Sequence, residues 1–183
     1  MSNLKIATDF VLRQEDSRLE GNITILRGDK GGATRFGLAS ASHPELVDQG
    51  YFDAAKVGRD AALAIAEKVY EQTYANPMRV AEINDQALAT AVLSFGVNAY
   101  VMKPIEFLQQ AATALGHPLK VDGQCGPATL AVVNAIDPTL LLNGFCAIVK
   151  AYYERLAQEN AADQAFLKGW LNRVDAWQTD AAA

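Results

Sequence analysis

The sequence predicts a mainly α-helical protein with one small β-hairpin. Over most of the 183 residues, apolar side chains recur at spacings of three and four, as they do on the buried face of a helix. One short β-branched stretch, residues 23–26, is followed directly by the turn-rich run RGDKGG at 27–32. We therefore expect roughly six or seven helices and one hairpin within a single domain, residues 1–183.

The first predicted helix follows an N-cap at Ser2 or Asn3 and continues to about Leu19. Residues 23–26 and 33–38 then form the two strands of the hairpin. The remaining helices are bounded by proline, glycine or capping residues, and we expect them at 59–76, 84–100, 104–115, from 127 for a short distance, at 138–160 and at 163–177.

Composition and charge exclude several functional classes. The formal net charge is −5 and no cluster of Lys and Arg stands out, so a nucleic-acid partner is not expected. No stretch approaches membrane-spanning length and the N-terminus does not resemble a signal peptide, so we expect a soluble chain made in the cytosol. Cys125 and Cys146 lack the spacing of metal ligands and are expected as buried free thiols; we expect neither a metal nor a cofactor.

The candidate catalytic residues are Glu20, Asp29 and Thr34, which surround the glycine-rich turn. Glycoside hydrolysis uses two carboxyl groups: one donates a proton to the leaving oxygen, and the other attacks the sugar or positions a water molecule. Glu20, near apolar neighbours, is the candidate acid, while Asp29 in its polar turn would stay ionised. From the spacing alone, a solvated Glu and a turn-forming Asp are the simpler interpretation.

The segment LEGNITILRGDKGGATRFGL, residues 19–38, resembles the signature of glycoside hydrolase family 108, the bacterial and phage N-acetylmuramidases. The resemblance continues in order along the chain. It includes VYEQTY at 69–74, SFGVNA at 94–99, VDGQCGPATL at 121–130 and GWLNRV at 169–174. Residues from about 104 to 177 resemble the family's peptidoglycan-binding helical segment. The fold implied by this resemblance is lysozyme-like.

The resemblance also implies roles for individual residues. The catalytic acid of the family corresponds to Glu20, and the order of residues in the phage-type lysozymes suggests Asp29 and Thr34 as its partners. The chain departs from the family pattern in three places, because Asn22 replaces a glycine, Ser94 replaces a frequent Asp, and Ala75 replaces a frequent Trp.

Four further residues are candidates for substrate binding: Tyr70, Tyr74, Asn98 and Asp122. The two tyrosines can stack on sugar rings or serve as core residues. Asn98 can bind an N-acetyl group or join two helices, and Asp122 lies in a turn that resembles a peptidoglycan-binding turn but is equally a tight loop.

The sequence thus predicts a peptidoglycan hydrolase that cuts the β-1,4 bond after N-acetylmuramic acid. The alternatives are a lytic transglycosylase, a non-catalytic peptidoglycan-binding protein and an interaction module without affinity for the wall. Without a signal sequence, the enzyme would reach the periplasm and cell wall through a phage holin or a secretion apparatus. The second route, that of an antibacterial effector, implies an immunity protein as a partner.

Overall fold

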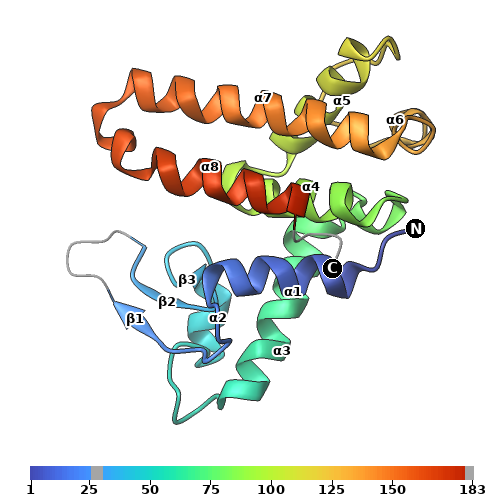
Figure 1. Cartoon of the computed structure of the whole chain (residues 1–183). Coiled ribbons are helices and arrows are strands. Elements are labelled where there is room, and N and C mark those ends of the chain that lie inside the picture. Colours follow the sequence, from blue (N-terminus) through green and yellow to red (C-terminus); the bar gives the residue numbers. More distant parts are fainter. Residues whose placement is uncertain (26–30, 180–183) are drawn as a thin grey trace.

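The computed structural model describes residues 1–25 and 31–179 and is mainly α-helical, as predicted (Figure 1). The α-helices of the described residues are α1 (Leu4–Glu15), α2 (Pro44–Asp48), α3 (Arg59–Val69), α4 (Gln86–Ala99), α5 (Met102–Ala114), α6 (Pro127–Val133), α7 (Pro138–Glu159) and α8 (Gln164–Thr179). Shorter helical segments are the π-helix η1 (Tyr70–Ala75) and the 3₁₀-helices η2 (Val80–Glu82) and η3 (Ala161–Asp163). The short helix α2 is the one that the sequence analysis did not predict.

The predicted hairpin is a three-stranded antiparallel sheet in the order β1-β2-β3. Strand β1 (Thr24–Ile25) pairs with β2 (Ala33–Arg35), and β2 pairs with β3 (Leu38–Ala39). The expected single strand 33–38 is wrong because Phe36 and Gly37 both adopt positive φ, +48° and +77°, and turn the chain back between β2 and β3. Most of the predicted turn between the first two strands lies outside the described residues.

Helix α1 begins as predicted but ends four residues earlier. The side chain of Asn3 caps it by accepting a hydrogen bond from the Lys5 N–H. At its other end, Asp16 is already extended, with φ −142° and ψ 92°, and Leu19 has a positive φ of +52°. The expected helix up to Leu19 is therefore wrong, and Glu15 becomes the last helical residue, beside the sheet.

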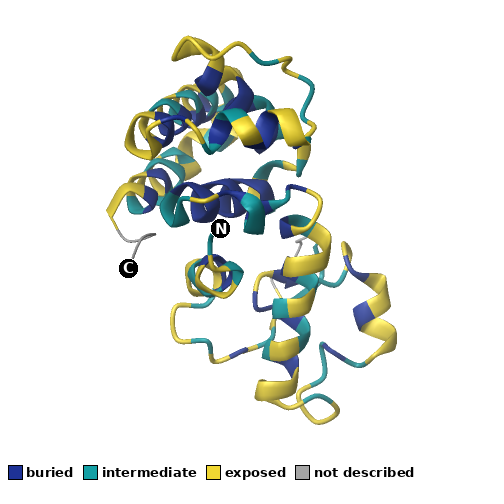
Figure 2. Cartoon of the chain, turned by 90° about the vertical axis from the view of Figure 1, so that its right-hand side faces the viewer, coloured by how far each residue is buried: buried dark blue, intermediate teal, exposed yellow. Residues whose placement is uncertain are grey.

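Helix α4 lies at the centre of the core, in contact with α1, α5, α7 and α8. Figure 2 shows its dark blue ribbon enclosed by the other helices, and every residue from 88 to 96 is buried. Phe95 lies within 6.4 Å, between ring centroids, of both Phe145 of α7 and Trp177 of α8. Burying such large aromatic side chains supplies a major part of folding free energy, so the C-terminal helices are held firmly on α4.

Cys125 and Cys146 are both buried and free, as predicted. Burial raises the pKa of the Cys125 thiol to about 11 and that of Cys146 to about 12, so both remain protonated thiols near neutral pH. Among residues 1–25 and 31–179, no single helix has both the length and the apolar character needed to cross a membrane; the pair α6 and α7 passes jointly, but it is bent by 112°.

Candidate active site

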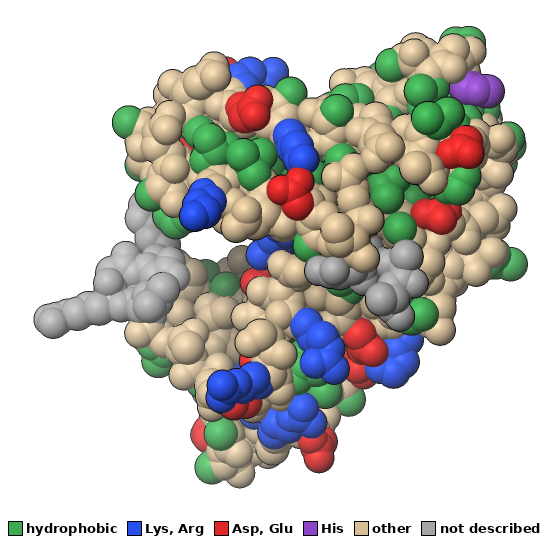
Figure 3. All heavy atoms as spheres, in the orientation of Figure 1, with side chains coloured by type: hydrophobic (Ala, Val, Ile, Leu, Met, Phe, Trp, Pro, Cys, Tyr) green, Lys and Arg blue, Asp and Glu red, His purple; other side chains and the backbone are tan. Residues whose placement is uncertain are grey.

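A cleft of about 310 Å³ opens between the end of α1 and the sheet. Figure 3 shows the surface hollowed between the helices α7 and α8 above and the part of the molecule that holds the sheet below. The residues lining the cleft come from the last turn of α1, the loop after it, strands β1 and β2, and the turn between β2 and β3: Glu15, Asp16, Ser17, Asn22, Thr24, Thr34, Phe36 and Gly37. The lining is mostly polar, which suits a sugar ligand with many hydroxyl groups.

Glu15 places a carboxylate in this cleft. As the last residue of α1, it accepts a hydrogen bond at Oε1 from Nη1 of Arg173 in α8, at 3.0 Å. The two side chains are 24% and 19% exposed, for Glu15 and Arg173 respectively. A charge-assisted hydrogen bond between partly buried groups is stronger than an ion pair at the surface, so this contact fixes the direction of the Glu15 carboxylate.

Backbone turns and a buried tyrosine hold the wall of the cleft beside Glu15. The hydroxyl of Tyr70 donates a hydrogen bond to the Phe36 carbonyl at 3.1 Å. Tyr70 opens the π-helix η1, whose wider turns are frequent at functional sites. Burial raises the pKa of Tyr70 far above its ordinary value, and the nearby negative charge of Glu15 adds to this effect. Tyr70 therefore stays a neutral donor that fixes the turn at Phe36.

Glu20, the acid predicted from the sequence, does not line this cleft. Its side chain is 50% exposed, and its Oε2 accepts a hydrogen bond from Nδ2 of Asn22 at 2.7 Å. Arg18 lies 3.7 Å from its other oxygen, measured to the Arg18 Nη1. The apolar surroundings expected around an acid that keeps its proton are thus not found at Glu20. Asp29 lies outside the described residues, whereas Thr34 lines the cleft as its pairing with Thr24 in the sheet requires.

The loop that carries Glu20 is fixed from two sides. The carboxylate of Asp16 accepts the Gly21 N–H at 2.7 Å, and Nε of Arg35 donates to the Gly21 carbonyl at 2.9 Å. Arg35 is 2% exposed and also donates to the carbonyls of Tyr51 and Val57, both at 2.8 Å. These bonds hold the backbone at Gly21 in place, and with it the outward position of Glu20.

The predicted substrate-binding residues take different places. Tyr70 is buried with its hydroxyl engaged, and Tyr74 is partly buried, which raises its pKa. Asn98 is exposed and donates from Nδ2 to the Ser94 carbonyl in its own helix. Asp122 accepts hydrogen bonds from Gln109 and from the backbone N–H of Gln124 in the loop before α6. None of the four lines the cleft beside Glu15.

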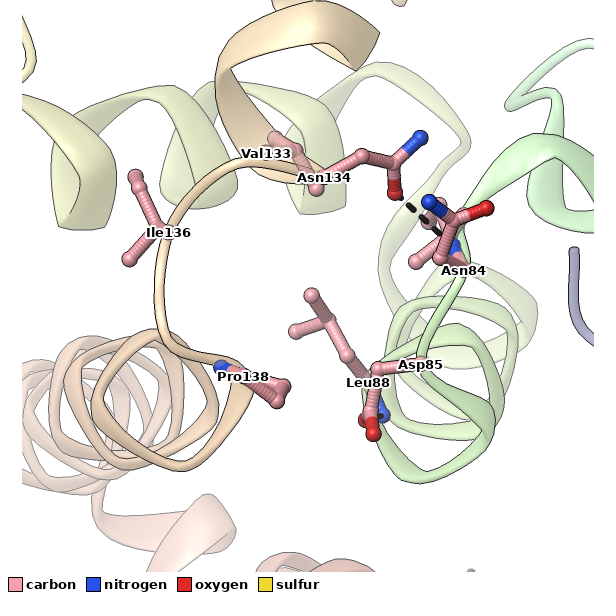
Figure 4. Close-up of a pocket in the computed structure, with 8 residues that line it drawn as sticks. Asn84, Asp85, Leu88, Val133, Asn134, Ile136 and Pro138 are labelled. Atoms are coloured by element: carbon pink, nitrogen blue, oxygen red, sulfur yellow. Dashed lines mark hydrogen bonds between the residues drawn. The ribbon is translucent and has the colours of Figure 1, made fainter.

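A second pocket, of about 230 Å³, lies between the start of α4 and the connection from α6 to α7 (Figure 4). Its polar groups already serve the fold. Oδ1 of Asn134 accepts the Asn84 N–H, the dashed line in Figure 4, and Nδ2 of Asn134 donates to the Glu82 carbonyl. Asp85 caps α4 through the Leu88 N–H. These groups therefore stabilise the fold, and the cleft at Glu15 is the better candidate for chemistry.

The described residues hold no cluster of three or more His, Cys, Asp or Glu side chains suited to a metal ion. A carboxyl group and a threonine that line the same polar cleft can transfer a proton and orient a water molecule. Glu15 could not be selected from the sequence, because the predicted helix continues past it to about Leu19 and places Glu20 at its end. The signal that singles it out is the contact with Arg173, which is distant in the sequence.

Comparison with known proteins adds two family matches and one similar structure. The model of a family described as "Glycosyl hydrolase 108" matches residues 15–99, and that of a family described as "Predicted Peptidoglycan domain" matches residues 103–175. SagA of Brucella abortus has a similar solved structure, with a TM-score of 0.70 and 21% sequence identity over 97% of this chain and 92% of SagA. At that identity the likeness establishes the fold. No curated protein matched.

The glycosyl hydrolase match begins at Glu15 and includes the whole lining of the cleft, and the peptidoglycan match includes Arg173. The chain therefore carries a glycosyl hydrolase 108 domain over residues 15–99 and a peptidoglycan domain over residues 103–175, and it is a glycoside hydrolase that acts on peptidoglycan.

Proposed function

We propose that the protein is an N-acetylmuramidase, which hydrolyses the β-1,4 bond between N-acetylmuramic acid and N-acetylglucosamine. The glycosyl hydrolase 108 match, together with the peptidoglycan segment, supports this substrate. The polar cleft that holds both Glu15 and Thr34 supports the reaction type, because hydrolysis needs a proton donor and an oriented water on the two sides of one bond.

Glu15 is the proposed general acid. The observation that carries this assignment is its place in the cleft: it lines the cleft together with Thr34, and Arg173 holds its carboxyl group, whereas Glu20 lies outside the lining. Glu15 donates a proton to the leaving sugar oxygen. Thr34 helps to orient the attacking water, and Asp29 supplies the second carboxylate, which stabilises the positive charge that develops on the sugar ring. The order of residues in the family motif favours Glu20, which is therefore the alternative acid.

Two isosteric variants decide between the acids. Glu15→Gln and Glu20→Gln each replace one carboxyl group by an amide of similar size, which cannot act as an acid. Purified peptidoglycan is digested with each variant and with the wild type, and the soluble products are analysed by mass spectrometry. We expect Glu15→Gln to lose at least roughly a hundredfold in rate, as loss of a general acid does. Glu20→Gln should keep most of the activity. The reverse result would move the acid to Glu20.

The product ends separate hydrolysis from the other candidate reactions. A muramidase leaves reducing N-acetylmuramic acid ends, whereas a lytic transglycosylase leaves anhydro ends. If neither the wild type nor the variants release fragments, although all of them sediment with peptidoglycan, the protein is a binding module.

We further propose that the enzyme acts on the cell wall from the periplasmic side, either as a phage lysis enzyme or as a secreted antibacterial effector. Expression in a Gram-negative host, with and without an added signal peptide, distinguishes action in the periplasm from an intracellular role. The chain should lyse cells when an added signal peptide directs it to the periplasm, and should be harmless in the cytoplasm. Relief of this lysis by a protein encoded next to it would identify an immunity partner and favour the effector.

A further inference from the structure

The Glu15–Arg173 contact joins the two family segments of the chain. Glu15 is the first residue of the glycosyl hydrolase match, and Arg173 lies near the end of the peptidoglycan match. The 3.0 Å bond from Nη1 of Arg173 to Oε1 of Glu15 spans 158 residues of sequence. Binding to the cell wall alone does not require a contact between this segment and a carboxylate of the candidate cleft. The contact therefore suggests a role for the segment in the cleft itself.

We propose that Arg173 is a positioning residue for catalysis: from α8 it directs the Glu15 carboxyl into the cleft, so that the peptidoglycan segment completes the active site. The inference rests on the proposed role of Glu15 as the acid. The position of Arg173 depends on the packing of α8. Trp177, one turn further along this helix, is fully buried against Phe95 and Phe145. The backbone that carries Arg173 is therefore rigid, and so is the direction it gives to Glu15.

Three polar side chains lie near the Glu15 carboxyl: the Arg173 guanidinium from α8, the Tyr70 hydroxyl from η1 and the Asp16 carboxylate. The Tyr70 hydroxyl donates its hydrogen bond to the Phe36 carbonyl, and a carboxylate accepts, so among these three groups Arg173 is the donor to Glu15. Removal of the guanidinium would therefore leave the Glu15 carboxyl free to turn away from the cleft.

These properties predict a kinetic pattern that lost packing alone would not produce. In Arg173→Gln we expect kcat to fall roughly ten- to a hundredfold, as for a catalytic group misplaced by about 1 Å, with KM within about threefold of the wild type. Arg173→Lys keeps a charged donor at this position and should restore part of kcat.

Lys150→Gln is the matched control. It removes another cation bound to α8, since Nζ of Lys150 contacts Asp175 at 2.6 Å, but that pair lies outside the lining of the cleft. This variant should retain the wild-type kcat and KM. Soluble peptidoglycan oligomers serve as the substrate for all variants, with circular dichroism and Tm recorded in parallel.

Three results would overturn the inference. The first is a wild-type kcat in Arg173→Gln. The second is an equal loss of activity in both Arg173 variants, matched by an equal loss of folded protein, which would assign Arg173 to stability alone. In both of these cases an inactive Glu15→Gln would leave the proposed acid intact. The third is an active Glu15→Gln, which would contradict the acid assignment and the positioning role together.

Discussion

Gly37 shows how closely the backbone approaches the candidate acid. It has a φ of +77°, and a Cβ built at this position would lie 2.7 Å from Cγ of Glu15 and 2.5 Å from the Tyr70 hydroxyl. Any larger residue must therefore displace one of these two groups. The absence of a side chain at this turn is what leaves room for Glu15 to face the sheet.

Gly37→Ala is expected to damage activity more than stability. The positive φ alone costs about 1–2 kcal/mol for a residue with a Cβ, and the contact with Glu15 pushes the carboxyl out of position. We expect a decrease of more than about tenfold in kcat with a fold that survives. Gly58→Ala is the control: Gly58 has a φ of −61° and open space around it, so its activity should not change. Equal behaviour of the two variants would contradict the crowding argument.

At the scale of elements, the loop between α5 and α6 is organised by one buried amide. Oε1 of Gln109 accepts the backbone N–H groups of Asp122 and Gly123, and its Nε2 donates to the Asp122 carboxylate and to the Thr129 hydroxyl. Gln109 is 1% exposed, so these bonds replace water that it cannot reach. Asp122 therefore has a structural role in this turn, although the turn resembles a peptidoglycan-binding turn.

The same contacts predict acid sensitivity. The hydrogen bond from Gln109, and next the backbone N–H of Gln124, hold the pKa of Asp122 below its ordinary value. A carboxyl with a lowered folded-state pKa stabilises the protein at pH values above the unfolded-state pKa, roughly 3.9, and this stabilisation is lost as the pH falls through the folded-state pKa. We therefore expect Asp122→Asn to have a lower Tm than the wild type near neutral pH. The difference should shrink as the pH falls below about 4. A constant difference would contradict the charge-dependent role.

How much of this could be predicted from the sequence differs between elements. Apolar spacing and proline boundaries predicted α3 to α8 closely, because local propensity and burial agree there. The end of α1 could not be predicted, since the first stop signal in the sequence is Gly21, while distant groups fix the actual backbone. Arg35 binds the Gly21 carbonyl and Arg59 binds the Leu19 carbonyl, at 2.9 and 2.8 Å.

That one boundary also decided the candidate site. With α1 extended to Leu19, Glu20 would stand at the helix end beside the sheet. With α1 ending at Glu15, this position belongs to Glu15 instead. Thr34 lines the cleft, and its catalytic role stays a prediction. Arg173 was recognised as part of a motif, but its contact with Glu15 depends on how α8 packs, which no local pattern contains.

At the scale of the molecule, the two family segments share one core. Helix α4 belongs to the glycosyl hydrolase segment, yet α5, α7 and α8 of the peptidoglycan segment pack on it. We therefore predict one cooperative unfolding transition for the whole chain.

The two tryptophans make this prediction testable, since both Trp170 and Trp177 lie in α8. Their fluorescence reports the peptidoglycan segment, while far-UV circular dichroism reports all helices. The two signals should give the same midpoint in urea and on heating. A tryptophan transition that precedes the loss of helix would show that the segments unfold separately, and would contradict the single domain predicted over residues 1–183.

The ion pair between Glu15 and Arg173 also bears on how the protein is made. A ribosome that has just completed residue 15 must add 158 more before the guanidinium exists. If Arg173 positions Glu15 as proposed, the growing chain contains Glu15, but not yet Arg173, during most of its synthesis. Catalytic competence would then arrive late in translation, after the helices that surround α4 have been made.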